Sequence, residues 1–403
     1  MTFLTTTESA MIEPIDQAAM LAQVERWSVI NSGSHNLNGL AAIARELAGS
    51  FGDLPGDVRF VDGTPIERVA PNGAIEPVGH GKHLVVSVRP QAQLRMLFTG
   101  HMDTVYPADY AFQALTWIDA STLNGPGVAD MKGGLAVMLA ALRAVEAAGC
   151  PAHFGYDVLI NSDEEVGSPS SAALIAELAR GKHCALTYEP AALPDGTLAG
   201  ARGGSGNFSI IVTGKSAHAG RNPDDGRNAL VAAADLTIRL KALHRPGLSI
   251  NPARIDGGGP NNVIPDHAVL RVNFRPATPA DETKAEAELA TLCEAIAREH
   301  NVAIARHGSF GRPPKPIDRG TQRLLDMVHD CGADLGLTIG WQTSGGVCDG
   351  NNIAACGVPV VDTMGVRGGA IHSSDEYLIV DSLRERASLS ALAIHRIVEQ
   401  GGL

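Results

Sequence analysis

The strongest constraint on the fold is an alternation, between residues 83 and 188, of apolar segments of strand length with segments of helical periodicity. Strands are predicted at residues 83–89 and 94–99, joined by a turn at Pro90. The later elements are a helix at 131–148 opened by glycines, a strand at 156–161, a helix at 169–179 and a strand at 184–188. This order favours an α/β layer with a mostly parallel sheet and helices on both faces.

The segments at both ends of the chain fit the same layer. Helical periodicity covers residues 15–30 and 36–51, and Gly52 follows as a stop signal. Near the C-terminus a strand is predicted at 358–362 and a final helix at 383–398.

The middle of the chain has a different order of elements, β-α-β-β-α-β. Its predicted segments are the strand 207–213, the helix 227–243, the strands 248–255 and 268–274, the helix 280–300 and the strand 302–306. This order predicts a ferredoxin-like α+β domain. We therefore expect one domain at residues 1–204 and 315–403, with an inserted domain at 205–314 that ends in the linker-like segment GRPPKP.

Charge and cysteine content exclude several classes of protein. A formal net charge of −12 argues against nucleic acid, for which there are only scattered basic residues, and against an anionic membrane. The six cysteines form no C-x-x-C pair, so we expect reduced thiols, with Cys348 as a small buried residue in its glycine-rich loop. The first residues lack a basic segment followed by an apolar one, so we expect no signal peptide, no transmembrane span and a cytoplasmic protein.

Five motifs carry imidazole or carboxylate groups at predicted strand ends. In GHMDTV, His101 and Asp103 lie two residues apart at the end of an apolar run, so both leave the same face of an extended strand. The other motifs are GPGVADMKGG with Asp130, NSDEEVGS with Glu164 and Glu165, YEP with Glu189, and IHSSDEY with His372. Open α/β sheets bind ligands beyond the carboxyl ends of their strands, where these motifs fall.

Histidine with several carboxylates and no cysteine suits zinc, cobalt or manganese in a hydrolytic site. Asp130 is the best candidate to bridge two ions, because flanking glycines allow the backbone to approach them. The adjacent Glu164 and Glu165 cannot point the same way from an extended backbone, so one can bind metal while the other acts as general base. Asp103 can orient His101 through the free ring nitrogen.

Together with GKSAHAG and NNVIP, these motifs resemble the co-catalytic dizinc peptidases and deacylases that include glutamate carboxypeptidase, acetylornithine deacetylase, succinyl-diaminopimelate desuccinylase and aminoacylase. The resemblance covers about residues 80–380 in the family's order. It implies one zinc held by His101, Asp130 and Glu189, and another held by His372, Asp130 and Glu165. It also implies that Glu164 is the general base and acid, that Asp103 is the partner of His101, and that the Asp130–Met131 peptide is cis.

The same resemblance implies that the inserted domain is a lid and a homodimerisation domain. His218 in GKSAHAG is similar to the histidine that reaches a neighbouring subunit's site and supports the tetrahedral oxyanion.

The resemblance is nearest to glutamate carboxypeptidase, in which the positions of Asn262 and Arg312 grip the substrate's α-carboxylate. Arg275 is a second candidate for that contact, with a structural salt bridge as its alternative role. The chain departs from the glutamate-specific pattern because AALPDGTLAG, after the E-P motif, contains no lysine. Arg202 is a possible substitute for that lysine.

We therefore expect a zinc-dependent hydrolase that cleaves an amide bond to a C-terminal amino acid of a small peptide substrate. One alternative is an N-acyl amino acid deacylase. An alternative of another class is a catalytically silent homologue that binds peptides or metals.

Overall fold

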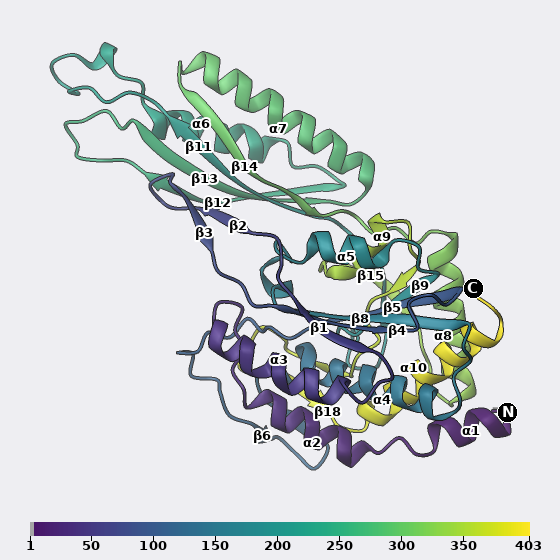
Figure 1. The fold of residues 1–403 in the computed structure, drawn as a ribbon. Helices are drawn as coiled ribbons and strands as arrows, with labels where there is room; N and C mark the ends of the chain where they lie inside the picture. Colours follow the sequence, from purple (N-terminus) through teal and green to yellow (C-terminus); the bar gives the residue numbers. More distant parts are fainter. Residues whose placement is uncertain (1–3) are drawn as a thin grey trace. The chain divides into compact units, whose positions relative to one another are not determined.

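The computed structural model describes residues 4–403, and the chain forms two compact units (Figure 1). The first comprises residues up to 64, 79–201 and 317–403, and the second comprises 65–78 and 202–316. Residues 65–78, expected in the first domain, group instead with the second unit, where Arg271 Nη2 donates a hydrogen bond of 2.8 Å to the Val69 carbonyl.

The first unit is built on a six-stranded sheet, and the predicted mostly parallel arrangement is confirmed. Its spatial order is β1 (Asp57–Val61), β4 (His83–Val88), β8 (Phe154–Asn161), β5 (Leu94–His101), β9 (Cys184–Thr187) and β16 (Val360–Val361). The strands β8, β5, β9 and β16 run parallel, whereas β4 is antiparallel to both of its neighbours. Although β4 and β5 are consecutive in the chain, β8 lies between them.

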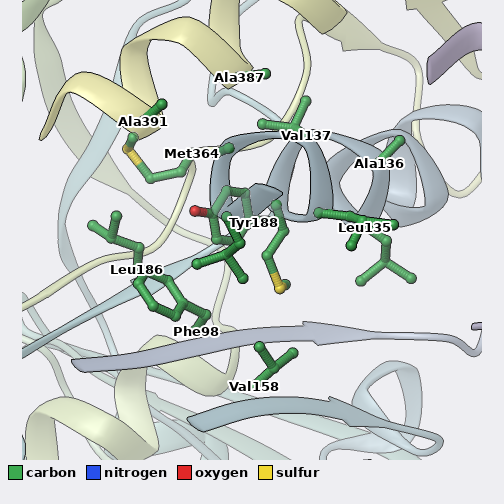
Figure 2. Packing of buried hydrophobic residues seen from close by; sticks show 14 of the residues in the cluster. Phe98, Leu135, Ala136, Val137, Val158, Leu186, Tyr188, Met364, Ala387 and Ala391 are labelled. Atoms are coloured by element: carbon green, nitrogen blue, oxygen red, sulfur yellow. The ribbon is translucent and has the colours of Figure 1, made fainter. Parts of the chain in front are cut away.

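Helices cover both faces of this sheet. Neighbouring residues of each strand point to opposite faces, so each strand contributes side chains to two separate cores. Phe98, Val158 and Leu186 pack with α4 (Gly134–Ala147) and α10 (Ser382–Glu399), as Figure 2 shows. Leu97, Leu159 and Ala185 belong to a separate core with α5 (Ala172–Ala179) and α9 (Asp349–Ala355). The remaining helices of the unit are α1 (Thr6–Ile12), α2 (Gln17–Ser28), α3 (Leu37–Phe51) and α8 (Arg319–Asp334). Among the described helices, none is both long and apolar enough to cross a membrane.

Several short strands of the first unit have no predicted counterpart. A four-stranded sheet contains, in spatial order, β17 (Gly368–Gly369), β18 (Tyr377–Ile379), β7 (Thr122–Asn124) and β6 (Thr116–Trp117). A separate pair is formed by β10 (Leu198–Arg202) and β15 (Trp341–Ser344). The strands of the four-stranded sheet have two or three residues each and are too short to show an alternating pattern, so periodicity could not reveal them.

The second unit confirms the predicted β-α-β-β-α-β order. Its elements are β11 (Ser205–Thr213), α6 (Ala229–Ala242), β12 (Leu248–Gly257), β13 (His267–Pro276), α7 (Pro279–Glu299) and β14 (Ala303–Arg312). The strands form one antiparallel sheet in the order β12-β13-β11-β14, and the two helices share a core with it. The unit also contains the hairpin of β2 (Ile66–Val69) and β3 (Ile75–Val78).

Candidate metal centre

Three adjacent parallel strands end at the candidate site. His101 is the last residue of β5, Glu189 follows β9, and Glu164 and Glu165 lie in a 3₁₀ turn at Glu164–Val166 shortly after β8. Because parallel strands end at one edge of a sheet, these groups meet there although they are distant in sequence.

Asp130 enters the same site from the kinked segment Val128–Gly133 that precedes α4, and the Asp130–Met131 peptide is cis, as the resemblance implied. Gly134, the first residue of α4, lies so close to the Tyr188 carbonyl that a Cβ there would be 1.9 Å from its oxygen. The absence of a side chain at Gly134 therefore allows the start of α4 to approach the end of β9.

His372 completes the group of five predicted metal ligands. It follows β17 and has a left-handed backbone with φ of 63°, a region that histidine occupies more readily than most residues. Its side chain is 52% exposed, whereas that of His101 is 1% exposed. The site is therefore open to solvent on the His372 side.

The two oxygens of Asp130 face two different imidazoles. Asp130 Oδ1 lies 3.0 Å from His101 Nε2, and Asp130 Oδ2 lies 3.2 Å from His372 Nε2. Glu189 Oε2 is 3.7 Å from His101 Nε2, and Glu165 Oε2 is 3.1 Å from His372 Nε2. The carboxylate of Asp130 is thus shared by two imidazole–carboxylate pairs, as a bridging ligand requires.

The charges of these groups fit divalent cations. Burial favours a lower pKa for His101, but Glu189, Asp103 and Asp130 raise it well above the usual value. Hydrogen bonds with Asp130 and Glu165 raise the pKa of His372 to about 11. Burial and the charge of Asp130 raise the pKa of Glu165 well above the usual value. Protons on the two histidines and on Glu165 therefore partly offset the negative charge of the neighbouring carboxylates. Metal cations bound between the same nitrogen and oxygen atoms would replace these protons.

The potential ligand atoms are close enough to share ions. One ligand atom from each of His101, Asp130 and Glu165 lies within 4.8 Å of the others, and the same holds for His101, Glu164 and Glu189. Imidazole and carboxylate donors without thiolate match zinc, cobalt or manganese. The residues present therefore fit a metal centre.

Asp103 positions both His101 and the glutamate turn. His101 Nδ1 lies 3.0 Å from the Asp103 backbone carbonyl, which can only accept, so this nitrogen donates and Nε2 faces Asp130. The Asp103 carboxylate is 3.4 Å from Nδ1 and accepts hydrogen bonds from the backbone N–H groups of Glu164 and Glu165 at 3.1 and 3.2 Å. Ser34 Oγ donates to the same carboxylate at 2.7 Å. Ser34 was not among the predicted site residues, because no sequence motif distinguishes it.

A cavity of about 530 Å³ adjoins this centre. Glu165 and Val166 line it, together with Gly33, Ser34, His35, Asn36, Thr104, Val105, Pro107 and Ala108. It provides space for part of a small molecule beside the Glu165 carboxylate.

The other predicted site residues belong to the second unit, where two motifs run side by side. Asn262 accepts a hydrogen bond from Ala219 N at 2.9 Å through its backbone carbonyl, which brings it next to the loop of His218. His218 Nδ1 accepts from the backbone N–H groups of Gly220 and Arg221, both at 3.1 Å, so its proton is on Nε2. His218 therefore presents an exposed N–H donor.

Arg275 and Arg312 also lie near each other. Burial and the charge of Arg312 lower the pKa of Arg275, and Arg275 Nε donates to Asn273 Oδ1 at 2.9 Å. Two neighbouring guanidinium groups attract an anion such as a carboxylate.

Comparison with known proteins places the chain among peptidases and deacylases. Residues 97–396 match the profile of Peptidase family M20/M25/M40. The chain is 30% identical over 389 residues to carboxypeptidase G2 of Pseudomonas sp. (strain RS-16), covering 94% of this chain and 89% of the relative. It is 30% identical over 323 residues to succinyl-diaminopimelate desuccinylase of Stenotrophomonas maltophilia (strain R551-3), covering 75% and 84%. A tripeptidase structure from Staphylococcus aureus subsp. aureus Mu50 superposes with a TM-score of 0.72 at 24% identity, covering 96% of this chain and 99% of that one.

Proposed function

The chain belongs to peptidase family M20/M25/M40, whose members are metallohydrolases of amide and peptide bonds, and we propose that it releases a C-terminal amino acid from a peptidyl or acyl group. The observation that carries the proposal is the Asp130 carboxylate, with one oxygen facing His101 and the other facing His372. The broader match to carboxypeptidase G2, over 94% of this chain against 75% for the desuccinylase, favours the carboxypeptidase reaction.

Two zinc ions are the proposed cofactors. His101, Asp130 and Glu189 would hold one, and His372, Asp130 and Glu165 would hold the other. Bound there, the ions would supply polarisation of the scissile carbonyl and a lower pKa of the attacking water.

Glu164 is the proposed general base and acid. A carboxylate oxygen of Glu164 lies within 4.8 Å of a ring nitrogen of His101 and a carboxylate oxygen of Glu189. The Asp103 carboxylate holds the turn by accepting a hydrogen bond from the backbone N–H of Glu164. From this position Glu164 takes the proton of the attacking water and passes it to the leaving amine.

The second unit is the proposed lid and homodimerisation domain. In this role the Nε2–H of His218 donates to the oxyanion of a neighbouring subunit's site, as preorganised donors do in amide hydrolysis. Arg312 and Asn262 bind the substrate's α-carboxylate, with Arg275 adding positive charge beside Arg312.

An N-acyl amino acid deacylase is the second candidate, because the chain is also 30% identical over 323 residues to succinyl-diaminopimelate desuccinylase. A silent homologue that binds peptides or metals is the third. All five ligand side chains are present and close together, which disfavours the silent homologue.

A panel of dipeptides and folyl amino acids, tested beside N-acetyl and N-succinyl amino acids, separates these candidates. We expect zinc-dependent release of the C-terminal amino acid from the first group, detected by mass spectrometry and abolished by a chelator. Cleavage of only the N-acetyl or N-succinyl compounds would assign the deacylase reaction instead. No chelator-sensitive cleavage of any compound would contradict both.

A further inference from the structure

Glu376 is a fully buried carboxylate that takes part in neither the proposed ligand set nor the proposed proton transfer. It belongs to IHSSDEY, the motif of His372, and its pattern of contacts is unusual. Its Oε1 accepts hydrogen bonds from the backbone N–H groups of Ala129 at 2.9 Å and Asp130 at 3.0 Å. Its Oε2 accepts from Gly127 N at 3.2 Å and lies 2.7 Å from the Tyr106 hydroxyl.

These contacts account for the hydrogen-bonding capacity of the side chain. A carboxylate has about four lone-pair directions, and Glu376 meets four donors. It is therefore not a further metal ligand. Three of the four donors are backbone groups of the segment that ends at Asp130.

The same residue is tied to the loop of His372. Asn124 Nδ2 donates to the backbone carbonyls of Glu376 at 2.7 Å and Ser374 at 3.0 Å. The Tyr106 hydroxyl also lies 2.8 Å from the Ser373 carbonyl, so it contacts both this loop and the Glu376 carboxylate. Glu376 thus joins two loops, one carrying Asp130 and the other carrying His372.

We propose that Glu376 is a positioning residue that holds the Asp130 and His372 loops at the spacing required by the two metal ions. The inference rests on the proposed dinuclear site. Partners behind metal ligands typically change metal affinity by about 10- to 100-fold when they are replaced. The inference therefore predicts a loss of metal affinity in a protein that keeps all five proposed ligands.

Glu376→Gln is the most informative substitution because it preserves the size of the side chain. A glutamine side chain has one acceptor oxygen and one NH₂ group. The NH₂ group would therefore face either the N–H of Gly127 or the two N–H groups of Ala129 and Asp130. One side of the loop must then move or lose its hydrogen bonds.

Asp157→Asn is the matched control. Asp157 is also a buried carboxylate of the first unit, paired with Arg95 at 2.6 Å and Lys182 at 2.8 Å, but it contacts no loop that carries a proposed ligand. Its replacement removes a buried charge without altering the support of Asp130 or His372.

The experiment is zinc titration calorimetry of the chelator-stripped full chain, with circular dichroism to verify folding of each variant. We expect two zinc ions per wild-type chain, affinity reduced at least 10-fold in Glu376→Gln, and less than threefold change in Asp157→Asn. Glu376→Gln within threefold of the wild type, or equal losses in both variants, would overturn the positioning role. Failure of the wild-type chain to bind zinc would instead count against the proposed function.

If Glu376→Gln does not fold, Tyr106→Phe replaces it in the same titration. This variant removes one of the four donors while keeping the ring contacts with Tyr110 and Phe112. A loss of zinc affinity greater than threefold supports the inference, and a smaller change contradicts it.

Discussion

Asp130 offers each of its oxygens to a different histidine. The candidate groups around it could be named from residue types, whereas their grouping around Asp130 was implied by the family resemblance. His101, Glu165, Glu189 and His372 all occur in short motifs with polar groups at strand ends, and the structure brings them together. The contacts that orient them could be predicted only in part. Asp103 was expected to orient His101, but the shorter contact of His101 Nδ1 is with the Asp103 backbone carbonyl, and backbone groups leave no mark in a sequence.

Glu164 provides the sharpest test at the residue scale. Glu164→Ala is expected to keep its fold and its zinc but to lower kcat by roughly 10²- to 10⁴-fold, because general acid–base catalysis is worth about that factor. Steady-state kinetics with zinc analysis by mass spectrometry checks both parts. Near-normal turnover in a zinc-loaded variant would remove Glu164 from this role.

At the level of elements, periodicity located the long strands and helices but did not reveal how they pair. The strands β4 and β5 are consecutive in sequence, and their separation by β8 depends on contacts between distant segments. The hairpin of residues 65–78 grouped with the second unit for the same reason. The short strands β17 and β18 flank the loop of His372, although neither has a detectable sequence pattern.

The approach of α4 to β9 gives a prediction at this scale. Gly134→Ala is expected to destabilise the protein by about 1–3 kcal/mol, because the new Cβ would overlap the Tyr188 carbonyl oxygen. The displacement also separates Asp130 from Glu189, so zinc affinity should fall. Denaturant unfolding and zinc titration measure the two effects.

Gly49→Ala is the matched control for that substitution. Gly49 lies within α3, and a Cβ there meets nothing within 4 Å. Replacement by the better helix former should therefore stabilise the protein by about 0.5–1 kcal/mol and leave zinc affinity unchanged. Equal destabilisation by both substitutions would show that the close approach at Gly134 is not the cause.

For the whole molecule, metal binding should be coupled to stability. The buried carboxylates of Asp130, Glu165 and Glu189 repel one another without a cation, so chelation should lower Tm. Zinc at 100 times its Kd adds about 2.7 kcal/mol for one site, which corresponds to a rise in Tm of roughly 3 °C for a chain of 403 residues. Differential scanning calorimetry checks this, and Asp130→Ala should show no such rise.

The most direct test of the dinuclear centre is a crystal structure of the zinc-loaded chain with anomalous data at the zinc absorption edge. We predict two peaks roughly 3.5–4 Å apart, bridged by Asp130, one beside His101 and Glu189 and the other beside His372 and Glu165. A single peak, or peaks remote from Asp130, would contradict the dinuclear assignment.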